Sequence, residues 1–523
     1  MERSTVQILE EIDYFLRLKR LVSANKKSCG NSKSQSGRIK MKKTNEGGNQ
    51  YEFSMDHHLE FFSKAGSLFV NRQSFYGQEE SALSLFQKMW VAEKKLAMKL
   101  LFWLRDCRGG AGNRSGFREC IKWLAENDPN WLKLNLELIP EVGRWDDLKV
   151  LFGSPLEKDA ARLWGKAIRN KNVLAAKWAK REMIPLQRYF RTKEAGLRKL
   201  LSNLRKEHIV EFKMCSNLWN KIEYEKVPSI AMARYTKAFI KHDKERFDLF
   251  KQMVREGKIK IKASVLFPHD CVRTVRFGDS ETADMQFEAL PNYLDGEKER
   301  IIVISDTSSS MCTLVSGSIR AVDVSQGMAL YCSAKIPENN PFHKKFIGFC
   351  SESKFKDWNG MSFSQAVNDR NIFDRAAGGT RIDKALDLIL NSAKFFNVSQ
   401  DQMPTCLLII SDMQFHQGLT TGSAWRKNRR TCKENQTEVN KALARWKEAG
   451  YKIPKIIYWN TAGYAGSPET VKAENVALVS GFNTSILKAV FSASEFTPYT
   501  IMLKAVEKYK IKRPRIRKKI RRK

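Results

Sequence analysis

Between residues 300 and 480 the sequence alternates short apolar runs with stretches of helical periodicity, and this alternation constrains the fold more than any other feature. We expect strands at 301–305, 345–350, 405–411, 454–459 and 475–479, and helices near 319–335, 380–396, 433–449 and 483–492. Strands that alternate with helices form a mostly parallel sheet. The sequence therefore predicts an α/β doubly wound, Rossmann-like domain over residues 295–500.

Clusters of oxygen ligands occur at three places in this domain. Asp306, Ser308 and Ser310 follow the first apolar run, Thr380 follows two glycines at the start of a helical stretch, and Asp412 ends another apolar run. The carboxyl ends of parallel strands converge on one crevice, and carboxylates with hydroxyls suit a hard divalent cation. The sequence predicts that these five residues bind Mg2+ or Mn2+. The alternative is an ordinary loop in which Asp306 and Ser308 cap the next helix.

The order of these clusters resembles the metal-ion-dependent adhesion site (MIDAS) of von Willebrand factor A domains. Matched residue by residue, Asp306, Ser308 and Ser310 stand for the first loop of that family, Thr380 for the second and Asp412 for the third. Ser309 departs from the pattern, because the intracellular branch of the family usually has Gly there. The resemblance implies a Mg2+-binding domain that accepts a partner's carboxylate at an open metal position and joins assemblies rather than catalysing.

Residues 53–290 show apolar residues at three- and four-residue spacing, interrupted by short Gly, Asn and Pro turns. Short helices with short breaks are typical of a stacked, HEAT-like α-helical array. Residues 1–52 form an N-terminal extension, in which the Lys-, Ser-, Asn- and Gly-rich stretch 24–50 indicates a flexible linker. The acidic stretch 279–299 indicates a loop-like hinge before the sheet domain.

Three motifs in the helical region carry a second resemblance, at residues 105–110, 140–147 and 227–235. They resemble an uncharacterised family of plants, fungi and giant viruses in which a helical module precedes a von Willebrand A domain. The arrangement is also similar to the Ro ribonucleoprotein, whose helical TROVE module binds small and misfolded RNAs. The resemblance implies that residues 53–290 are a TROVE-like domain and that RNA is a partner.

The charge distribution also favours a polyanionic partner, because the formal net charge is +35. Residues 162–206 contain fourteen Lys and Arg against two Glu, and we expect RNA contacts from Lys177, Lys180, Arg181, Arg188 and Arg191. The aromatic residues interleaved with them, Trp164 among them, are expected in the core. A second basic group, Arg426, Lys427, Arg429 and Arg430, follows Asp412 and is expected to overhang the cation site. The basic tail 510–523 is either an RNA clamp or a nuclear import signal.

These features together predict a non-enzymatic RNA-binding scaffold with a Mg2+-dependent ligand site. The alternative is a protein–protein adaptor that docks an acidic partner segment through the metal without specific RNA binding. A Mg2+-dependent phosphodiesterase is a third reading, for which only Asp374 or Asp383 is close enough in sequence to add a carboxylate. No set of catalytic residues can be nominated. Scattered cysteines, no signal-like N-terminus and no apolar run long enough for a bilayer favour a soluble intracellular protein without membrane partners, cytoplasmic or nuclear.

Overall fold

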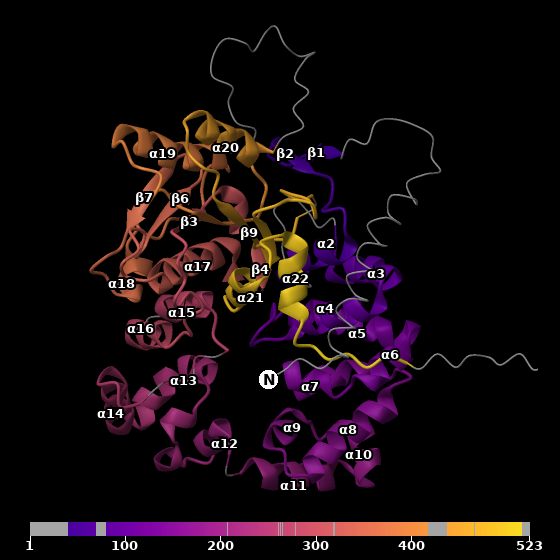
Figure 1. Cartoon of the computed structure of the whole chain (residues 1–523). Coiled ribbons are helices and arrows are strands. Elements are labelled where there is room, and N and C mark those ends of the chain that lie inside the picture. Colours follow the sequence, from indigo (N-terminus) through magenta and orange to yellow (C-terminus); the bar gives the residue numbers. More distant parts are fainter. Residues whose placement is uncertain are drawn as a thin grey trace, which may run out of the picture. The chain divides into compact units, whose positions relative to one another are not determined.

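The computed structural model describes residues 40–69, 80–206, 208–259, 261, 263, 265–277, 279–316, 319–416, 437–464 and 466–514. The chain divides into two compact units, residues 1–40 and 41–523, and every element below belongs to the second (Figure 1). The predicted basic group Arg426, Lys427, Arg429 and Arg430 lies outside the described residues, as do residues 515–523 of the tail.

The N-terminal region is helical, as the apolar spacing predicts. After the hairpin β1 (Met41–Lys43) and β2 (Asn49–Tyr51), its helices are α2 (His57–Lys64), η1 (Ala65–Ser67), α3 (Ala82–Ala92), α4 (Lys94–Arg105), α5 (Arg114–Asn127), α6 (Pro129–Leu134), α7 (Leu138–Val142), η2 (Trp145–Leu151), α8 (Glu157–Arg169), α9 (Val173–Trp178), α10 (Ile184–Phe190), α11 (Glu194–Arg205), α12 (Val210–Cys215), η3 (Trp219–Lys221), η4 (Tyr224–Lys226), α13 (Ser229–His242), α14 (Lys244–Arg255), α15 (Pro268–Arg276) and α16 (Ser280–Glu288). The apolar faces of α2–α11, α15 and α16 merge into one core with the sheet, whereas those of η4, α13 and α14 form a second, smaller core.

The C-terminal region is a six-stranded mixed sheet. In chain order its strands are β3 (Ile301–Asp306), β6 (Lys345–Phe349), β7 (Ser353–Asp357), β8 (Cys406–Ser411), β9 (Lys455–Asn460) and β10 (Val476–Ser480), and across the sheet they run β10-β9-β8-β3-β6-β7. All neighbours are parallel except β6 and β7. The other elements are η5 (Ser309–Cys312), β4 (Leu314–Ser316), β5 (Ile319–Arg320), α17 (Ala321–Lys335), α18 (Phe363–Asn368), α19 (Ile382–Phe395), α20 (Glu438–Glu448), α21 (Ile486–Ser492) and α22 (Pro498–Val506). Figure 1 shows α17 on one side of the sheet and α19 with α20 on the other.

Five strands lie within one residue of their predicted bounds, because each is a buried apolar run. The antiparallel edge strand β7 and helix α18 were not predicted. The sequence of β7 is Ser-Lys-Phe-Lys-Asp, in which only Lys356 is buried, so it offers no apolar run to detect. Lysines are common on edge strands, where charge discourages pairing with other chains.

Two stretches predicted to be loops are ordered. Residues 41–51 form the β1–β2 hairpin, whose Tyr51 exchanges backbone hydrogen bonds of 2.9 Å with Ser467. Residues 280–288 of the predicted acidic hinge form α16, and Asp284 accepts hydrogen bonds from the backbone and hydroxyl of Ser364 at 2.6 and 2.8 Å. Composition predicts loops here because it cannot register partners that are distant in sequence.

Helix α2 ties the start of the described chain to the far edge of the sheet. It packs against β10 and α22. The Ser480 hydroxyl donates to the Phe62 carbonyl at 2.6 Å, and the Ser67 hydroxyl donates to the Asn460 carbonyl at 2.7 Å while accepting from the Gly481 amide at 3.0 Å. The end of β10 therefore completes its hydrogen bonds with residues more than 400 positions earlier.

Candidate cation site and basic surface

The predicted cation ligands gather at the point where the strand order of the sheet reverses. Strands β3 and β8 are neighbours, but the chain continues from β3 to β6 on one side and from β8 to β9 on the other. In open α/β sheets a crevice forms outside the carboxyl ends of such a strand pair and is the usual place for a ligand. Asp306 is the last residue of β3, and Asp412 follows the last residue of β8.

Both aspartates are completely buried. One Asp306 carboxylate oxygen, Oδ1, accepts from the backbone amide of Ser308 at 2.9 Å, and the other accepts from the Ser411 hydroxyl. Asp412 Oδ1 accepts from the backbone amide of Gln414 at 3.0 Å. These bonds fix the orientation of the two carboxylates.

Burial, and next to it the charge of Asp412, raise the pKa of Asp306 to about 7, against the smaller lowering effect of hydrogen bonds from Ser411 and Ser308. Two buried carboxylates close enough to repel cannot both stay ionised without a compensating positive charge. A divalent cation between them supplies that charge, so the electrostatics of the pair fit Mg2+ or Mn2+.

The hydroxyl ligands predicted from the sequence are buried beside this pair. Ser308, Ser310 and Thr380 are 1%, 3% and 1% exposed, so water does not saturate their oxygens. The Ser308 and Ser310 hydroxyls are 3.1 Å apart. The Ser309 amide donates to the Gly378 carbonyl at 2.9 Å, which joins the loop after β3 to the loop that carries Thr380. The loops of the five predicted ligands are therefore brought together.

The capping alternative does not describe Asp306 or Ser308. The next long helix, α17, begins at Ala321 and has Arg320 at its N-cap position. Ser308 precedes the short helix η5, but its side chain makes no capping hydrogen bond. The two side chains thus face the crevice loops instead of a helix N-terminus.

The two additional carboxylates considered for two-metal chemistry are already paired with cations. Asp374 Oδ1 lies 3.0 Å from the buried Lys356 ammonium. Asp383 receives two hydrogen bonds from the Arg381 guanidinium, at 2.8 and 2.6 Å. Within the described ranges, no group of three or more His, Cys, Asp or Glu is placed to hold a metal ion. The candidate site consists of two carboxylates with hydroxyls.

Sequence reasoning missed the polar side chains that hold the Thr380 loop. The Gly379 amide donates to the Ser351 hydroxyl at 2.8 Å, and the Thr380 amide donates to Nδ1 of His416 at 2.7 Å. Gly378 has φ of +74° and lies against Ser351, while a Cβ on Gly379 would lie 2.8 Å from the His416 ring. The paired glycines were the one sequence signal of this close packing.

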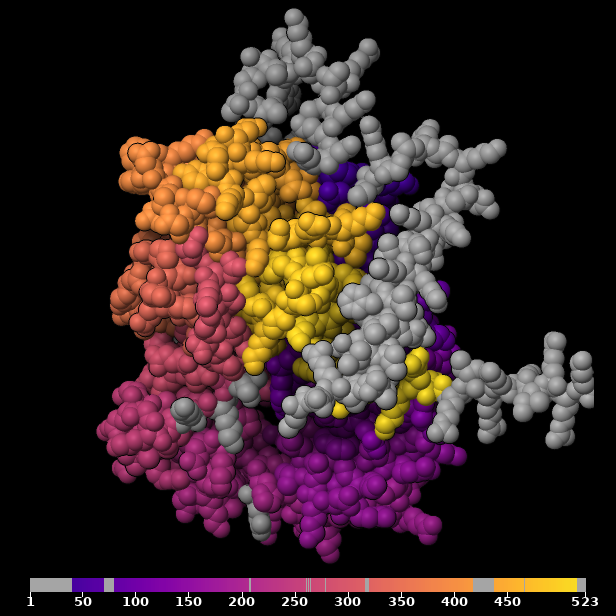
Figure 2. Space-filling view, in the orientation of Figure 1, coloured from indigo at the N-terminus to yellow at the C-terminus, as the bar shows by residue number. Residues whose placement is uncertain are grey.

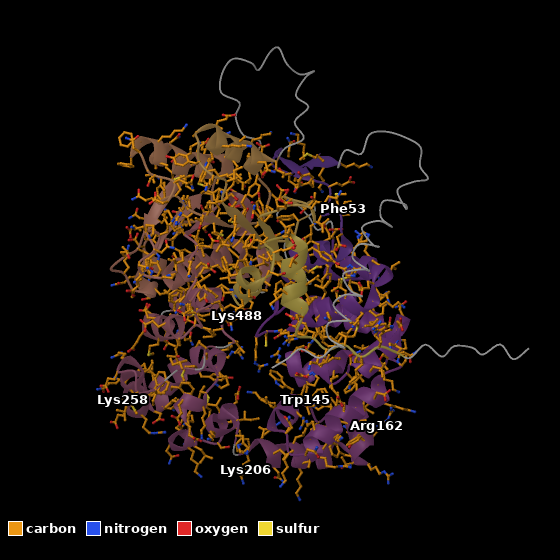
Figure 3. All side chains as sticks on the ribbon, viewed as in Figure 1. Phe53, Trp145, Arg162, Lys206, Lys258 and Lys488 are labelled. Atoms are coloured by element: carbon orange, nitrogen blue, oxygen red, sulfur yellow. The ribbon has the colours of Figure 1, made fainter. Side chains whose placement is uncertain are left out.

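Most cations of segment 162–206 are exposed (Figure 3, in which Arg162 and Lys206 are labelled). Three of the five predicted RNA contacts are in ion pairs: Lys177 with Glu211 at 3.0 Å, Arg181 with Glu194 at 3.0 Å and Arg188 with Glu157 at 3.4 Å. The other two, Lys180 and Arg191, are exposed. Figure 2 shows this purple segment as part of the visible surface.

Among the aromatic residues of this segment, Trp164 lies in the core, as expected, whereas Trp178, Tyr189 and Phe190 are half-buried. Trp164 is fully buried, and its indole Nε1 donates to the Ala175 carbonyl at 2.9 Å. The ring of Tyr189 covers Gly165, and the Arg169 guanidinium lies 5.2 Å from its centroid. These rings stabilise the packing of α8 against α9 and α10 and are not presented as a stacking surface.

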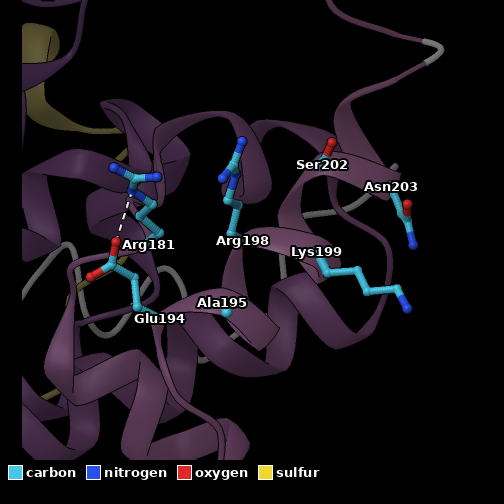
Figure 4. Close-up of a pocket in the computed structure, with 7 residues that line it drawn as sticks. All are labelled: Arg181, Glu194, Ala195, Arg198, Lys199, Ser202 and Asn203. Atoms are coloured by element: carbon cyan, nitrogen blue, oxygen red, sulfur yellow. Dashed lines mark ion pairs between the residues drawn. The ribbon is translucent and has the colours of Figure 1, made fainter.

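An open groove of about 520 Å³ runs along α11 and was not identified from the sequence (Figure 4). Its lining comprises Arg181, Glu194, Ala195, Arg198, Lys199, Ser202 and Asn203. Glu194 is paired with Arg181, whereas Arg198 and Lys199 are exposed and form no ion pair with any described residue. The groove therefore presents two uncompensated cations beside neutral hydrogen-bonding side chains.

Two family models match the chain. Residues 300–521 are similar to the family described as Domain of unknown function (DUF7788), and residues 44–148 and 185–302 to Domain of unknown function (DUF2828). The two matches overlap at residues 300–302, where β3 begins. Among the described helices, none combines the length and apolar character needed to cross a membrane.

An uncharacterized protein of Acanthamoeba polyphaga mimivirus is 24% identical over 532 residues, which cover 89% of this chain and 87% of that protein. Among solved structures, the Deinococcus radiodurans RO (RSR) protein matches with a TM-score of 0.45 and 12% identity, over 87% of this chain and 100% of its own. The mimivirus relative agrees with the giant-virus part of the sequence resemblance. The von Willebrand A and TROVE assignments stay predictions, because the matching family models are the two domains of unknown function.

Proposed function

We propose that this chain is a non-enzymatic RNA-binding scaffold, with a TROVE-like helical region and a von Willebrand A-like domain that holds Mg2+ or Mn2+ for a second ligand. The observation that carries the proposal is the exposed cationic surface of α8–α11, where segment 162–206 contains fourteen Lys and Arg against two Glu. Such a surface attracts the phosphate backbone independently of base sequence.

The α11 groove is the part of this surface that fits a phosphate backbone best. Arg198 and Lys199 are not neutralised by any described carboxylate, while Ser202 and Asn203 can donate to phosphate oxygens. Lys177, Arg181 and Arg188 contribute less, because each must first leave its acidic partner. Lys180 and Arg191 extend the cationic surface beyond the groove.

The RNA proposal is tested by reversing charge within the groove. The Arg198→Glu/Lys199→Glu variant should bind a labelled 20-nucleotide RNA at least ten times more weakly than the wild type at fixed salt, with a salt slope shallower by about 2 units. The matched control is Lys237→Glu/Lys241→Glu on α13, which changes two exposed cations by the same charge. Equal losses of RNA affinity in both variants would show that RNA binding depends only on net charge, and would contradict an RNA-binding surface on α11.

The cation half of the proposal rests on the buried Asp306–Asp412 pair. Five protein oxygens, from Asp306, Asp412, Ser308, Ser310 and Thr380, would leave at least one octahedral position of Mg2+ for another ligand. Full-length protein should melt at a higher temperature in Mg2+ than in EDTA, and Asp412→Ala should remove that difference. Coincident wild-type melts would contradict the cation site.

The open position also supports the second candidate function, an adaptor that docks an acidic protein segment. A carboxylate is a suitable oxygen ligand for Mg2+, whereas RNA would offer a phosphate there. In the adaptor, RNA affinity is independent of Asp412. In a site shared by metal and RNA, Asp412→Ala lowers RNA affinity, so the same variant measured with labelled RNA shows whether a phosphate or a carboxylate takes the open metal position.

A further inference from the structure

We propose that Glu46 and His416 form a latch that positions Thr380 for the cation, and that the N-terminal hairpin thereby controls the site. The inference rests on the proposed cation site and adds residues that do not touch the metal. Its evidence is a continuous chain of contacts from the β1–β2 turn, through the His416 ring, to the backbone of the Thr380 loop.

The first contact fixes the backbone of Thr380 through both its amide and its carbonyl. The Thr380 amide donates to His416 Nδ1 at 2.7 Å, and the His416 amide donates to the Thr380 carbonyl at 2.9 Å. The hydroxyl of Thr380 is attached to this clamped backbone and is buried with it. A shift of the ring therefore moves a predicted ligand oxygen.

The second contact fixes the ring. Because Nδ1 accepts a hydrogen bond from an amide, the proton of the neutral imidazole is on Nε2. Nε2 lies 2.6 Å from Oε2 of Glu46, which accepts that proton's hydrogen bond. A carboxylate behind a histidine selects its tautomer and orientation, as it does for histidines that bind metals directly.

The third set of contacts fixes the turn that carries Glu46. The Thr44 hydroxyl and the Gly48 amide donate to the Phe415 carbonyl at 2.7 and 3.1 Å, and the Asn45 amide donates to the side chain of Gln414 at 3.0 Å. A Cβ on Gly48 would lie 2.3 Å from the Phe415 carbonyl oxygen. The turn is thus docked against the segment that directly follows Asp412.

The latch consequently joins two of the three ligand loops. The side chain of Gln414 contacts the turn, and its backbone amide donates to Asp412 Oδ1, while His416 holds Thr380. Displacing the hairpin would loosen both loops directly, and the loop of Asp306 only through them, because its own contacts are with Ser411, next to Asp412, and with the Gly378 carbonyl. We therefore expect the hairpin to affect cation affinity more than the fold of the sheet.

The test measures Mn2+ binding to the full-length protein by electron paramagnetic resonance, with melting in EDTA recorded for each variant. His416→Ala should weaken Mn2+ binding at least tenfold, within the 10–100-fold range typical of residues that orient ligands. His416→Asn places an amide oxygen where Nδ1 stood and should restore binding to within about threefold of the wild type. Glu46→Ala should fall between the two, because the ring stays but loses its partner.

The matched control is His343→Ala, which removes another half-buried histidine whose Nδ1 contacts a backbone carbonyl, that of Ile336, at 2.8 Å. It should leave Mn2+ affinity unchanged. If His416→Ala and Glu46→Ala lower the melting temperature in EDTA but bind Mn2+ like the wild type, the contacts are structural and the latch is wrong. If the wild type itself binds no Mn2+, the proposed cation site fails instead.

Discussion

Replacing Asp306 by Asn should stabilise the metal-free protein near pH 8, although it removes a proposed cation ligand. Asp306 is fully buried, and its pKa is raised to about 7 by burial and by the charge of Asp412. Asparagine has nearly the same shape and no charge. Its oxygen can still accept from the Ser308 amide, as Oδ1 does at 2.9 Å.

The sign of the effect follows from proton binding. Because the folded-state pKa of Asp306 lies above the ordinary value of 3.8, the folded protein binds more protons than the unfolded chain between about pH 4 and pH 7. Without metal, the contribution of Asp306 to the free energy of unfolding is most favourable below about pH 4 and is lost as the pH rises through 7. A difference of roughly three pKa units corresponds to about 4 kcal/mol. Weakening the Ser411 hydrogen bond offsets about 1 kcal/mol of the gain.

The assay is thermal melting in EDTA and in Mg2+ at pH 5, 6, 7 and 8. In EDTA at pH 8, Asp306→Asn should melt on the order of 5–10 °C above the wild type, with the gap narrowing toward pH 5. Mg2+ should raise the melting temperature of the wild type and not that of the variant. An Asn variant that melts below the wild type in EDTA at pH 8 would refute the view that the two carboxylates repel each other in the fold.

Two further predictions concern the helical region. Asp147→Ala removes the carboxylate that lies 2.7 Å from Nε of Arg105, a guanidinium only 3% exposed. The variant should lower the free energy of unfolding in urea denaturation by about 3–5 kcal/mol, and an unchanged urea midpoint would contradict this. Trp164→Ala should cost about 3–5 kcal/mol because the ring is fully buried, while RNA affinity measured well below the melting temperature stays at the wild-type value. Weaker RNA binding by the folded variant would show that the ring stacks on a base.

The sheet could be predicted because its information is local. Each parallel strand is an apolar run that β-sheet pairing buries, and Asp306 and Asp412 stand directly at the ends of two such runs, so strand ends and candidate ligands can be predicted together. The strand order adds what sequence alone lacks, namely that Asp306 and Asp412 belong to neighbouring strands at the reversal point. The two carboxylates repel each other because these strands are adjacent.

The residues that support the site could not be predicted, because their partners are distant in sequence. Glu46 and His416 are separated by 370 positions, and Glu46 lies in a stretch whose composition indicates a linker. His416 belongs to no metal-ligand spacing, since it contacts a backbone amide and a carboxylate. The groove on α11 was missed for a related reason: charge counts do not reveal that Arg181 is paired and that Arg198 has no ion pair with a described residue.

The same long-range contacts predict that the sheet domain is incomplete when it is cut at its sequence boundary. Phe61 and Phe62 of α2 are fully buried, and Ser67 bonds both the Asn460 carbonyl and the Gly481 amide at the ends of β9 and β10. Removing residues 40–69 would expose these apolar surfaces and leave two backbone groups without their partner, at about 1–3 kcal/mol for each group.

A chain of residues 70–523 should therefore melt well below a chain of residues 40–523, and Ser67→Ala in the longer chain should reproduce part of the loss. Circular dichroism of both chains in EDTA measures this without reference to the cation. Equal melting of the sheet in the two chains would show that α2 and the hairpin are accessories to the domain. A lower melting temperature would show that this segment completes the sheet, and Glu46, which contacts the His416 ring beside the Thr380 loop, enters the domain from the same 30-residue stretch, 40–69.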